Sequence, residues 1–307
     1  MPVAAHNPLI EFARTIRLEH TLFALPFALG TALLAEPPWP DGWSLALIVA
    51  CMAAARTAAM GMNRLADAAL DARNPRTAGR AIPAGRLSRR AALAFTLASA
   101  AAFVALAWLF LPLRGNTWPG LLAPAFLAVL LGYSWTKRFT ALTHWWLGLC
   151  LGLAPVGVWI ALRGELGLMP VLIGAGVMFW TAGFDILYSL QDLAVDLRDG
   201  LQSVPARLGR AAAMRAAAAC HVATLACLAP VPLMCLPGAT FGRAGVASLA
   251  AMVIIAATLA EEHLRARRRS DAWIAVAFFP LNAFVSIIWL AGVVADVAVG
   301  LDLRVTP

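Results

Sequence analysis

Long apolar runs recur along this chain, and they restrict its fold more than any other feature of the sequence. A membrane-spanning helix needs about 20 mostly apolar residues. The connections between the runs are short, except at 64–90 and 191–210, and they leave no room for a separate soluble domain. We therefore predict an all-α membrane protein in which residues 1–307 form a single domain with nine transmembrane helices. These helices are expected at about 16–35, 44–63, 91–112, 118–136, 145–163, 169–190, 211–235, 243–260 and 273–295.

The composition agrees with this class of protein and excludes several others. Apolar residues make up 62% of the chain and charged residues 13%, against about half and about a quarter in a soluble domain. A soluble protein with this balance would lack the polar surface that it needs to stay in water. The five cysteines are too few for a disulfide scaffold, and we interpret them as core residues. Glu19 and His20 lie within the first apolar run and argue against a cleaved secretory signal.

Basic residues are concentrated on one side of the predicted bundle. Of the 24 lysines and arginines, nineteen lie at the N-terminus or in loops on that side, four lie on the opposite side, and Arg56 lies within the second span. Because short cytoplasmic loops carry the excess of Lys and Arg, we expect the N-terminus and both long loops to be cytoplasmic, in a multi-pass protein of the cell inner membrane. The net charge of +8 would suit nucleic acid in a soluble protein. Here we expect no nucleic acid as a partner, and we assign the basic run at 265–269 to membrane lipid.

Each of the two long loops begins with acidic residues that run out of a helix. In the first, Asn63, Asp67 and Asp71 follow one another at intervals of four residues, which places them on one helix face with Arg56 two turns deeper. The second helix is expected to align four residues on one face in the same way. These are Asp185, Tyr188, Asp192 and Asp196. The pattern D-x-x-x-D therefore occurs twice, four spans apart, which indicates an internal pseudo-repeat.

Paired carboxylates beside arginines favour a magnesium-bound phosphate. Carboxylates four residues apart repel each other slightly on a helix, and Mg²⁺ prefers one or two carboxylates together with substrate phosphates. A single D-x-x-x-D beside loop arginines would more often be a solvated ion pair, but two copies with adjoining basic residues reverse that preference. Arg binds phosphate through a two-pronged fork. The basic residues available are Arg73, Arg76, Arg80, Lys137, Arg138 and Arg198.

These motifs resemble those of a known family of membrane enzymes. The first, Asn63-x-x-x-Asp67-x-x-x-Asp71, is similar to the first signature of the UbiA superfamily of intramembrane prenyltransferases. The second is similar to the second signature, and residues 133–138 resemble the segment after the fourth helix of that family. Arg64 departs from the pattern, since many members have Asp after the Asn. The likeness extends through Arg76, Thr77, Arg80, Pro83 and Gly85 in the first motif and through Gly200 and Ser203 in the second.

The resemblance implies a helical bundle around a central cavity and the transfer of a prenyl group from a polyprenyl diphosphate to an acceptor. Mg²⁺ would be held by Asn63, Asp67, Asp71, Asp192 and Asp196. The diphosphate would be bound by Arg76, Arg80, Lys137, Arg138 and Arg198. Tyr133 and Tyr188 would stabilise an allylic cation, and Asp185 would orient or deprotonate the acceptor's hydroxyl. Arg56, a charged residue within a span, would either bind a carboxylate on the acceptor or pair with a buried acid.

Residues 76–85 and 203–207 are most similar to the 4-hydroxybenzoate polyprenyltransferase branch of the superfamily, which implies an aromatic acid acceptor and a step of ubiquinone biosynthesis. Close relatives prenylate a dihydroxynaphthoate in menaquinone biosynthesis, and the sequence does not separate these two acceptors. An ion-coupled membrane transporter is an alternative of another class, but it predicts acidic residues near helix centres rather than at cytoplasmic helix ends. A structural subunit of a membrane complex would not explain the duplicated acidic pattern.

Overall fold

The computed structural model is entirely helical within the residues that it describes, which are 7–16, 23–36, 39–235, 245–268 and 271–305. A 3₁₀ turn, η2 (Leu190–Asp192), joins α8 to α9. The helices are α1 (Pro8–Thr15), α2 (Leu25–Ala35), α3 (Gly42–Arg73), α4 (Arg89–Trp108), α5 (Phe110–Arg114), α6 (Trp118–Thr136), α7 (Thr143–Arg163), α8 (Leu168–Ser189), α9 (Leu193–Asp199), α10 (Val204–Leu228), α11 (Pro230–Cys235), α12 (Val246–Arg268) and α13 (Asp271–Val305).

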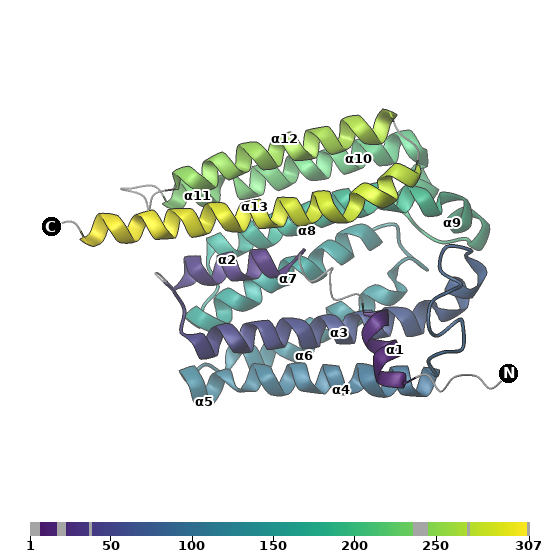
Figure 1. The fold of residues 1–307 in the computed structure, drawn as a ribbon, viewed down its shortest axis with the longest axis horizontal. Helices are drawn as coiled ribbons and strands as arrows, with labels where there is room; N and C mark the ends of the chain where they lie inside the picture. The colour runs from purple at the N-terminus through teal and green to yellow at the C-terminus, as the bar shows by residue number, and fades with distance from the viewer. Residues whose placement is uncertain (1–6, 17–22, 37–38, 236–244, 269–270, 306–307) are drawn as a thin grey trace.

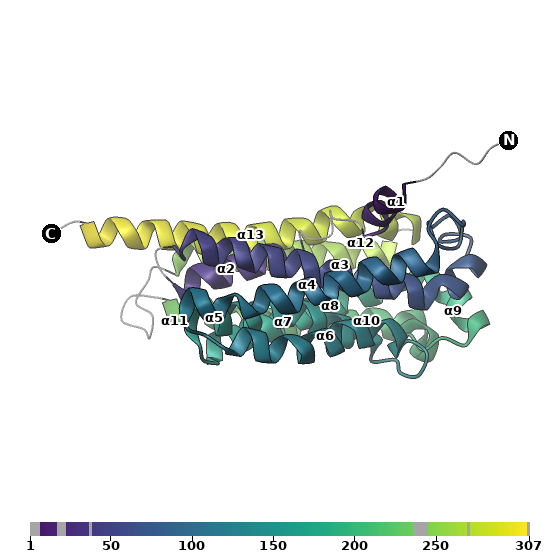
Figure 2. The same cartoon turned by 90° about the horizontal axis from the view of Figure 1, so that it is seen from below.

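The long helices lie side by side along one direction (Figures 1 and 2). We call the end of the bundle that carries residues 74–88 and α9 the loop end, and the opposite end, with α5 and α11, the far end (Figure 1). Helices α3, α4 and α6 contact one another in one half of the bundle, and α10, α12 and α13 lie in the other. Helices α7 and α8 pack against each other and join the two halves.

Eight helices in the described part of the chain are long and apolar enough to cross a membrane. They overlap the last eight predicted spans, so the prediction of an all-α membrane protein is confirmed. The first predicted span, 16–35, is represented by α2, which has only 11 residues and a length of roughly 16 Å. Residues 17–22, with Glu19 and His20, lie outside the described residues.

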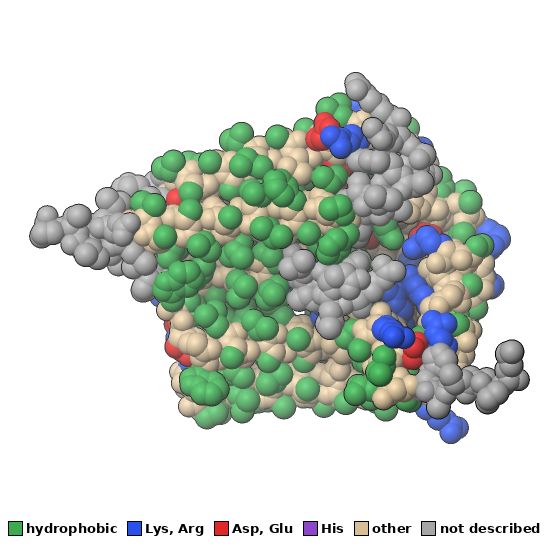
Figure 3. Space-filling model, viewed as in Figure 1, with side chains coloured by type: hydrophobic (Ala, Val, Ile, Leu, Met, Phe, Trp, Pro, Cys, Tyr) green, Lys and Arg blue, Asp and Glu red, His purple; other side chains and the backbone are tan. Residues whose placement is uncertain are grey.

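The two ends of the bundle are polar, whereas the surface between them is apolar. Figure 3 shows apolar side chains over the middle of the visible face and Lys and Arg side chains gathered at the loop end. At the far end, Arg114 pairs with Glu36 and Asp41, and its Nη1 donates to Ser44 Oγ at 2.9 Å. An apolar belt between two polar ends is the arrangement that a bilayer requires.

Helix α3 carries the first acidic motif without interruption. It begins at an N-cap, Asp41, whose carboxylate accepts a hydrogen bond from the Ser44 N–H. It then continues to Arg73, well past the predicted end of the second span. Asn63, Asp67 and Asp71 therefore share one helix face, as predicted.

The second acidic motif is not continuous, because η2 interrupts it. The prediction that Asp185, Tyr188, Asp192 and Asp196 lie along one helix is wrong, since α8 ends before Asp192 and α9 begins after it. A 3₁₀ turn advances about 120° per residue instead of about 100°. The regular helical spacing that would align Asp192 and Asp196 with Asp185 and Tyr188 is therefore broken at η2.

Helices α7 and α8 approach closely because small residues line one face of α7. A Cβ atom on Gly148 would lie 2.2 Å from the carbonyl oxygen of Met178, and one on Gly152 would lie 2.4 Å from the carbonyl oxygen of Gly174. Glycine at both positions lets the two backbones touch. His144 is one turn before Gly148 on the same face of α7, so this close packing presents His144 to α8 at the loop end.

Candidate active site

Asp67 lies on α3 at the loop end and is surrounded by basic groups. It is 3% exposed. Its Oδ1 accepts a hydrogen bond from Arg138 Nη2 at 3.1 Å, and its Oδ2 lies 3.0 Å from Lys137 Nζ and 3.2 Å from Asn63 Nδ2. Lys137 and Arg138 directly follow the last turn of α6, so that helix brings both to α3. A buried carboxylate is costly unless it is paired and hydrogen-bonded, and Asp67 has partners of both kinds.

Asp71, one turn further along α3, is bound by the loop that follows it. Arg80 Nη1 donates to both carboxylate oxygens, at 2.7 and 2.8 Å. The Thr77 hydroxyl donates to the Asp71 carbonyl at 3.1 Å, and the Arg80 N–H donates to the Thr77 carbonyl at 3.0 Å. These turns fold the loop back onto the helix and place Arg80 over Asp71.

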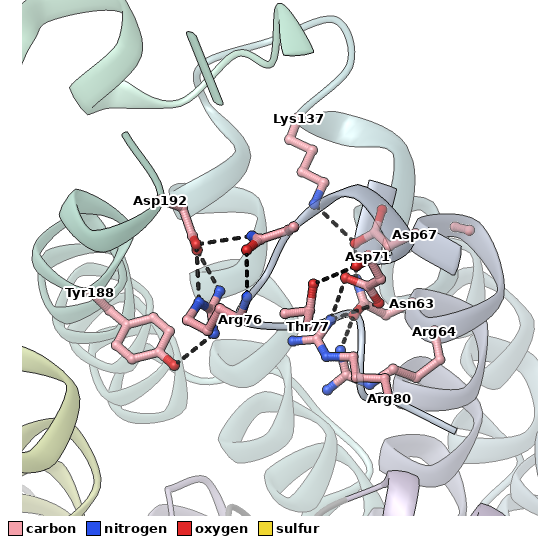
Figure 4. A network of polar contacts seen from close by, with 12 residues as sticks. Asn63, Arg64, Asp67, Asp71, Arg76, Thr77, Arg80, Lys137, Tyr188 and Asp192 are labelled. Carbon is pink, nitrogen blue, oxygen red and sulfur yellow. Dashed lines mark hydrogen bonds and ion pairs between the residues drawn. The ribbon is translucent and has the colours of Figure 1, made fainter. Parts of the chain in front are cut away.

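Asp192 joins the second motif to the first (Figure 4). Arg76 donates to it with two nitrogens, Nε to Oδ1 at 3.0 Å and Nη2 to Oδ2 at 2.5 Å. Asn74 Nδ2 lies 3.3 Å from the same Oδ1. Arg76 also contacts Tyr188, since its Nη1 donates to the hydroxyl at 3.4 Å and its guanidinium carbon lies 5.7 Å from the ring centroid. The two predicted motifs therefore meet at one end of the bundle.

Arg76 keeps its positive charge although it is partly withdrawn from water. Burial by itself would lower the pKa of Arg76, but the hydrogen bond and the charge of Asp192 outweigh that effect and raise the pKa above its usual value. A bidentate guanidinium–carboxylate pair is among the stronger polar contacts in proteins. Arg76 is thus a charged link between the two motifs.

Asp196 and Arg198 lie on α9, nearer the loop that leads to α10. Asp196 is half-buried, and its backbone carbonyl accepts a hydrogen bond from the Leu201 N–H at 2.8 Å. Arg198 Nε lies 3.1 Å from Asp199 Oδ1, and Arg198 Nη2 donates to the Arg73 carbonyl at 3.2 Å. Among the five basic residues predicted to bind diphosphate, Arg198 differs from the others because its carboxylate partner is its neighbour Asp199, not a motif residue.

A cavity of about 400 Å³ lies within the bundle next to this network. Its apolar lining extends to the far end, where Phe110 and Pro119 contribute to it. Arg76 and Arg80 line the cavity while they bind the motif carboxylates. The cavity therefore changes from charged to apolar along its length. The charged, amide and tyrosine side chains that line it are Arg56, Asn63, Arg64, Arg76, Arg80, Tyr133, Asp185 and Tyr188.

The donor set suits a metal ion that is bound together with a phosphate. Among the described residues, no three or more His, Cys, Asp or Glu side chains converge into a complete metal site. The carboxylates come as two pairs, and Asp67, Asp71 and Asp192 each attract a basic side chain. Asn63 adds a neutral oxygen, which accepts a hydrogen bond from Arg64 Nη1 at 3.3 Å. Hard oxygen ligands in pairs fit Mg²⁺, which completes its shell with substrate phosphates and water.

Asp185 has a partner that the sequence analysis missed. Its Oδ2 lies 2.7 Å from His144 Nδ1, and His144 is 2% exposed. A histidine at the start of an apolar run is a weak signal by itself, and its position near a loop with basic residues was the only hint. Asn74, which contacts Asp192, was also missed because its distance of 118 residues from Asp192 carries no local pattern.

The sequence profile of the UbiA prenyltransferase family matches residues 24–288. The chain belongs to this family. One relative is a 4-hydroxybenzoate octaprenyltransferase of Thiobacillus denitrificans, which is 34% identical over 236 residues that cover 77% of this chain and 75% of the relative. Another is a protohaem IX farnesyltransferase of Acidiphilium cryptum, 35% identical over 170 residues that cover 53% of this chain and 51% of the relative. The chain is therefore a prenyl-transferring enzyme, and its relatives act on more than one kind of acceptor.

Solved structures of UbiA homologues share the fold. The apo structure of a homologue from Aeropyrum pernix is 35% identical, with a TM-score of 0.77 over 91% of this chain and 98% of that one. A homologue from Archaeoglobus fulgidus bound to GPP and Mg²⁺ is 20% identical, with a TM-score of 0.64 over 94% of this chain and 99% of that one. The predicted membership of the UbiA family and the predicted fold class are both confirmed.

Proposed function

We propose that this UbiA-family enzyme transfers a polyprenyl group from its diphosphate to an aromatic acid, with 4-hydroxybenzoate as the leading acceptor and Mg²⁺ as cofactor. The observation that carries the proposal is the position of Arg76 and Arg80, which bind motif carboxylates on one side and line an apolar cavity on the other. A polyprenyl diphosphate has a highly charged head and a long apolar tail. At this boundary the charged end of the cavity can take the diphosphate head, and the apolar length of the cavity can take the tail.

The basic residues at the boundary neutralise the charge that builds on the leaving diphosphate. Arg76 and Arg80 face the cavity, Lys137 and Arg138 stand behind them at Asp67, and Arg198 lies outermost on α9. Mg²⁺ supplies Lewis-acid stabilisation of the same oxygens when it is bound. The residues proposed to hold it are Asn63, Asp67, Asp71, Asp192 and Asp196.

The chemistry is a substitution at the allylic carbon. The bond between that carbon and the diphosphate oxygen breaks, and its electron pair leaves with the diphosphate. Tyr133 and Tyr188 line the same cavity as Arg76 and Arg80, and an aromatic face there would stabilise a desolvated cation by about 1–2 kcal/mol. The acceptor ring then donates an electron pair to the allylic carbon and forms the new carbon–carbon bond, and the ring proton leaves to solvent.

Asp185 and Arg56 define the acceptor's place in this proposal. Both line the cavity. Asp185 accepts a hydrogen bond from the acceptor's hydroxyl, which makes the ring carbon beside it more electron-rich. Arg56 binds the acceptor's carboxylate, two turns deeper on α3 than Asn63. An aromatic ring that carries both a hydroxyl and a carboxylate satisfies both residues.

We also propose that the loop end faces the cytoplasm in the inner membrane. The support for this orientation is the excess of arginines at that end, which the positive-inside rule associates with the cytoplasmic side. Substrates with charged heads would then enter the site from the cytoplasmic side. Labelling single cysteines introduced at positions 79 and 165, in intact cells and in opened membranes, tests it, and the proposal requires that only position 165 react in intact cells.

The deciding experiment supplies the purified protein with octaprenyl diphosphate and either 4-hydroxybenzoate or a dihydroxynaphthoate, with Mg²⁺ or with EDTA, and identifies the product by mass. We expect prenylated 4-hydroxybenzoate with Mg²⁺ and no product with EDTA. If only the dihydroxynaphthoate gives a product, it is the acceptor in place of 4-hydroxybenzoate, and the proposal of an aromatic acid acceptor stands. Absence of product from both aromatic acids, or an equal rate in EDTA, would contradict the proposal.

A further inference from the structure

The contact between His144 and Asp185 is buried behind the cavity and not inside it. Asp185 lines the cavity, and its side chain is 20% exposed, whereas the side chain of His144 is 3% exposed. The two belong to α7 and α8, which Gly148 and Gly152 hold at backbone contact. His144 therefore reaches Asp185 from the protein side and leaves the cavity side of the carboxylate open.

The hydrogen bonds of His144 fix which of its nitrogens carries the proton. The backbone N–H of Val204 donates to His144 Nε2 at 3.3 Å. A nitrogen that accepts a hydrogen bond from an N–H carries no proton, so in the neutral ring the proton is on Nδ1. The contact of 2.7 Å with Asp185 is then a donation from Nδ1–H to the carboxylate.

Val204 is the first residue of α10, and its N–H has no partner within the helix. The preceding residue, Ser203, caps the same helix, because its hydroxyl accepts a hydrogen bond from the Ala206 N–H at 3.3 Å. Gln202, next to Ser203, donates its N–H to the Lys137 carbonyl at 2.7 Å. The first turn of α10 and the residue pair before it are thus in contact with both His144 and Lys137.

This turn is separate from the rest of α10. Gly209 interrupts the helix with φ 75° and ψ 166°, a conformation that an L side chain rarely adopts. Residues 204–208 are consequently placed by their own contacts and not by the transmembrane part of the helix. His144 is one of those contacts.

We propose that His144 is a positioning residue for Asp185. It holds Oδ2 through Nδ1–H, so that Oδ1 is presented to the acceptor's hydroxyl, and it makes this placement depend on the first turn of α10 through the Val204 N–H. The inference rests on the proposed function of Asp185. Residues that orient a functional side chain from behind typically contribute about 10- to 100-fold to activity.

The test compares three variants of the full-length protein in the prenylation assay. His144→Ala removes both hydrogen bonds, and His144→Asn keeps an amide N–H close to the position of Nδ1. The matched control is His221→Ala, another buried histidine, 3% exposed, whose Nδ1 lies 2.9 Å from His263 Nε2. It packs against α8 at Gly183, so it controls for any general loosening of that helix.

We expect His144→Ala to lower kcat by about 10- to 100-fold, with the KM for the prenyl diphosphate changed less than about twofold, because His144 does not touch the head-group residues. His144→Asn should recover most of the lost kcat. His221→Ala should lower Tm and leave kcat near the wild-type value. A wild-type kcat in His144→Ala would overturn the inference. So would a fall in kcat that His144→Asn also shows and that His221→Ala reproduces.

Selective ¹⁵N labelling of histidine separates this inference from the proposed acceptor. The His144 line, assigned by its loss in His144→Asn, should report a protonated Nδ1 and an unprotonated Nε2, and Asp185→Asn should shift it. If the wild-type protein prenylates neither aromatic acid, the acceptor proposal fails, and this spectrum decides the inference. A His144 line with the proton on Nε2, or one that Asp185→Asn leaves in place, would overturn it.

Discussion

The two acidic motifs are held in place by different means. Asp67 and Asp71 stand on one uninterrupted helix, are 3% and 6% exposed, and are bound by three basic side chains. Asp192 is the last residue of the 3₁₀ turn η2, its side chain is 21% exposed, and its ion-pair partner is Arg76 from the loop of the other motif. The first motif therefore has its carboxylates paired on one regular helix, whereas Asp192 of the second motif is bound by residues of the first loop.

The comparison shows that a repeated pattern in the sequence does not produce two equal sites. D-x-x-x-D is the same in both motifs, but the surrounding chain decides how many partners each carboxylate has. Asp67 and Asp71 are both paired with basic side chains, and a satisfied network of this kind holds its members in place. Asp192 has one ion-pair partner, Arg76, and one amide contact, Asn74, so its position depends on fewer charged contacts than that of Asp67.

The largest effect on activity is expected at the first motif. Asp67→Asn removes the charge that faces Lys137 and Arg138, and it leaves two partly buried cations without their counter-ion. We expect the rate of diphosphate release to fall by about 10²- to 10³-fold and Tm to fall as well. Release is measured on membranes with labelled prenyl diphosphate, and Tm on the detergent-solubilised protein. An unchanged rate would show that Asp67 has only a structural role.

The link between the motifs distinguishes Arg76 from Arg80. Arg76 uses two nitrogens, Nε and Nη2, on the two oxygens of Asp192, whereas Arg80 reaches both oxygens of Asp71 with Nη1 alone. One ammonium group can replace the second arrangement but not the first. We expect Arg76→Lys to lower kcat/KM for the prenyl diphosphate by about tenfold, equivalent to one lost charged hydrogen bond, and Arg80→Lys to lower it about twofold or less. Equal falls in kcat/KM for the two variants would contradict this difference between Arg76 and Arg80.

A smaller effect is expected at Asn74, the second contact of Asp192 with the first loop. Its Nδ2 lies 3.3 Å from Asp192, and its Oδ1 accepts a hydrogen bond from the Arg76 N–H at 3.0 Å. Asn74→Ala should weaken the link by about 1 kcal/mol, which corresponds to about a fivefold fall in kcat/KM. Asn74→Asp preserves the acceptor for the Arg76 N–H and places a like charge beside Asp192, so it should be worse than Asn74→Ala. The reverse order would contradict the proposed link.

The smallest effect is expected at the far end, which serves as the control for charge removal. Hydrogen bonds from the side chain and backbone of Ser44 lower the pKa of Asp41 below its usual value of 3.8. A lowered pKa in the folded state adds stability at pH values above about 3.8, and this stability is lost as the pH falls through the lower folded value. Asp41→Asn should cost about 1 kcal/mol or less at neutral pH, lose this difference as the pH falls below 3.8, and leave kcat unchanged. Thermal melts of both proteins between pH 3 and pH 7 measure it.

The helices of this fold follow from the sequence because each is a long apolar run bounded by charged or polar residues. Thr136 and Lys137, for example, mark the end of α6 where the apolar run ends. The spacing of Asp67 and Asp71 likewise predicts their common face, since both lie within one regular helix. These predictions depend only on local periodicity.

The pairing of side chains across the site does not follow from the sequence. Six arginines or lysines near the motifs were equivalent at that level, and only the folded loops assign Arg76 to Asp192 and Arg80 to Asp71. The turn η2 was missed because the helical period continues through it. His144 was missed because its role arises from its contacts with Asp185 and with the backbone N–H of Val204. The spacing of Gly148 and Gly152 indicates a close helix contact, but it does not say which side chain that contact brings to Asp185.

The hydrogen bonds between Arg76 and Asp192 join residues that are 116 positions apart, and this separation sets an order of events during biosynthesis. At roughly 5–20 residues per second, a ribosome needs about 6–23 s to progress from one to the other. Asp67 and Asp71 reach the membrane surface first. The helices that enter the membrane in the following interval are α4, α6, α7 and α8. For several seconds, therefore, the nascent chain contains the first acidic motif but not the second. A chaperone or protease that binds the emerging protein encounters Asp67 and Asp71 before Asp192 has been synthesised.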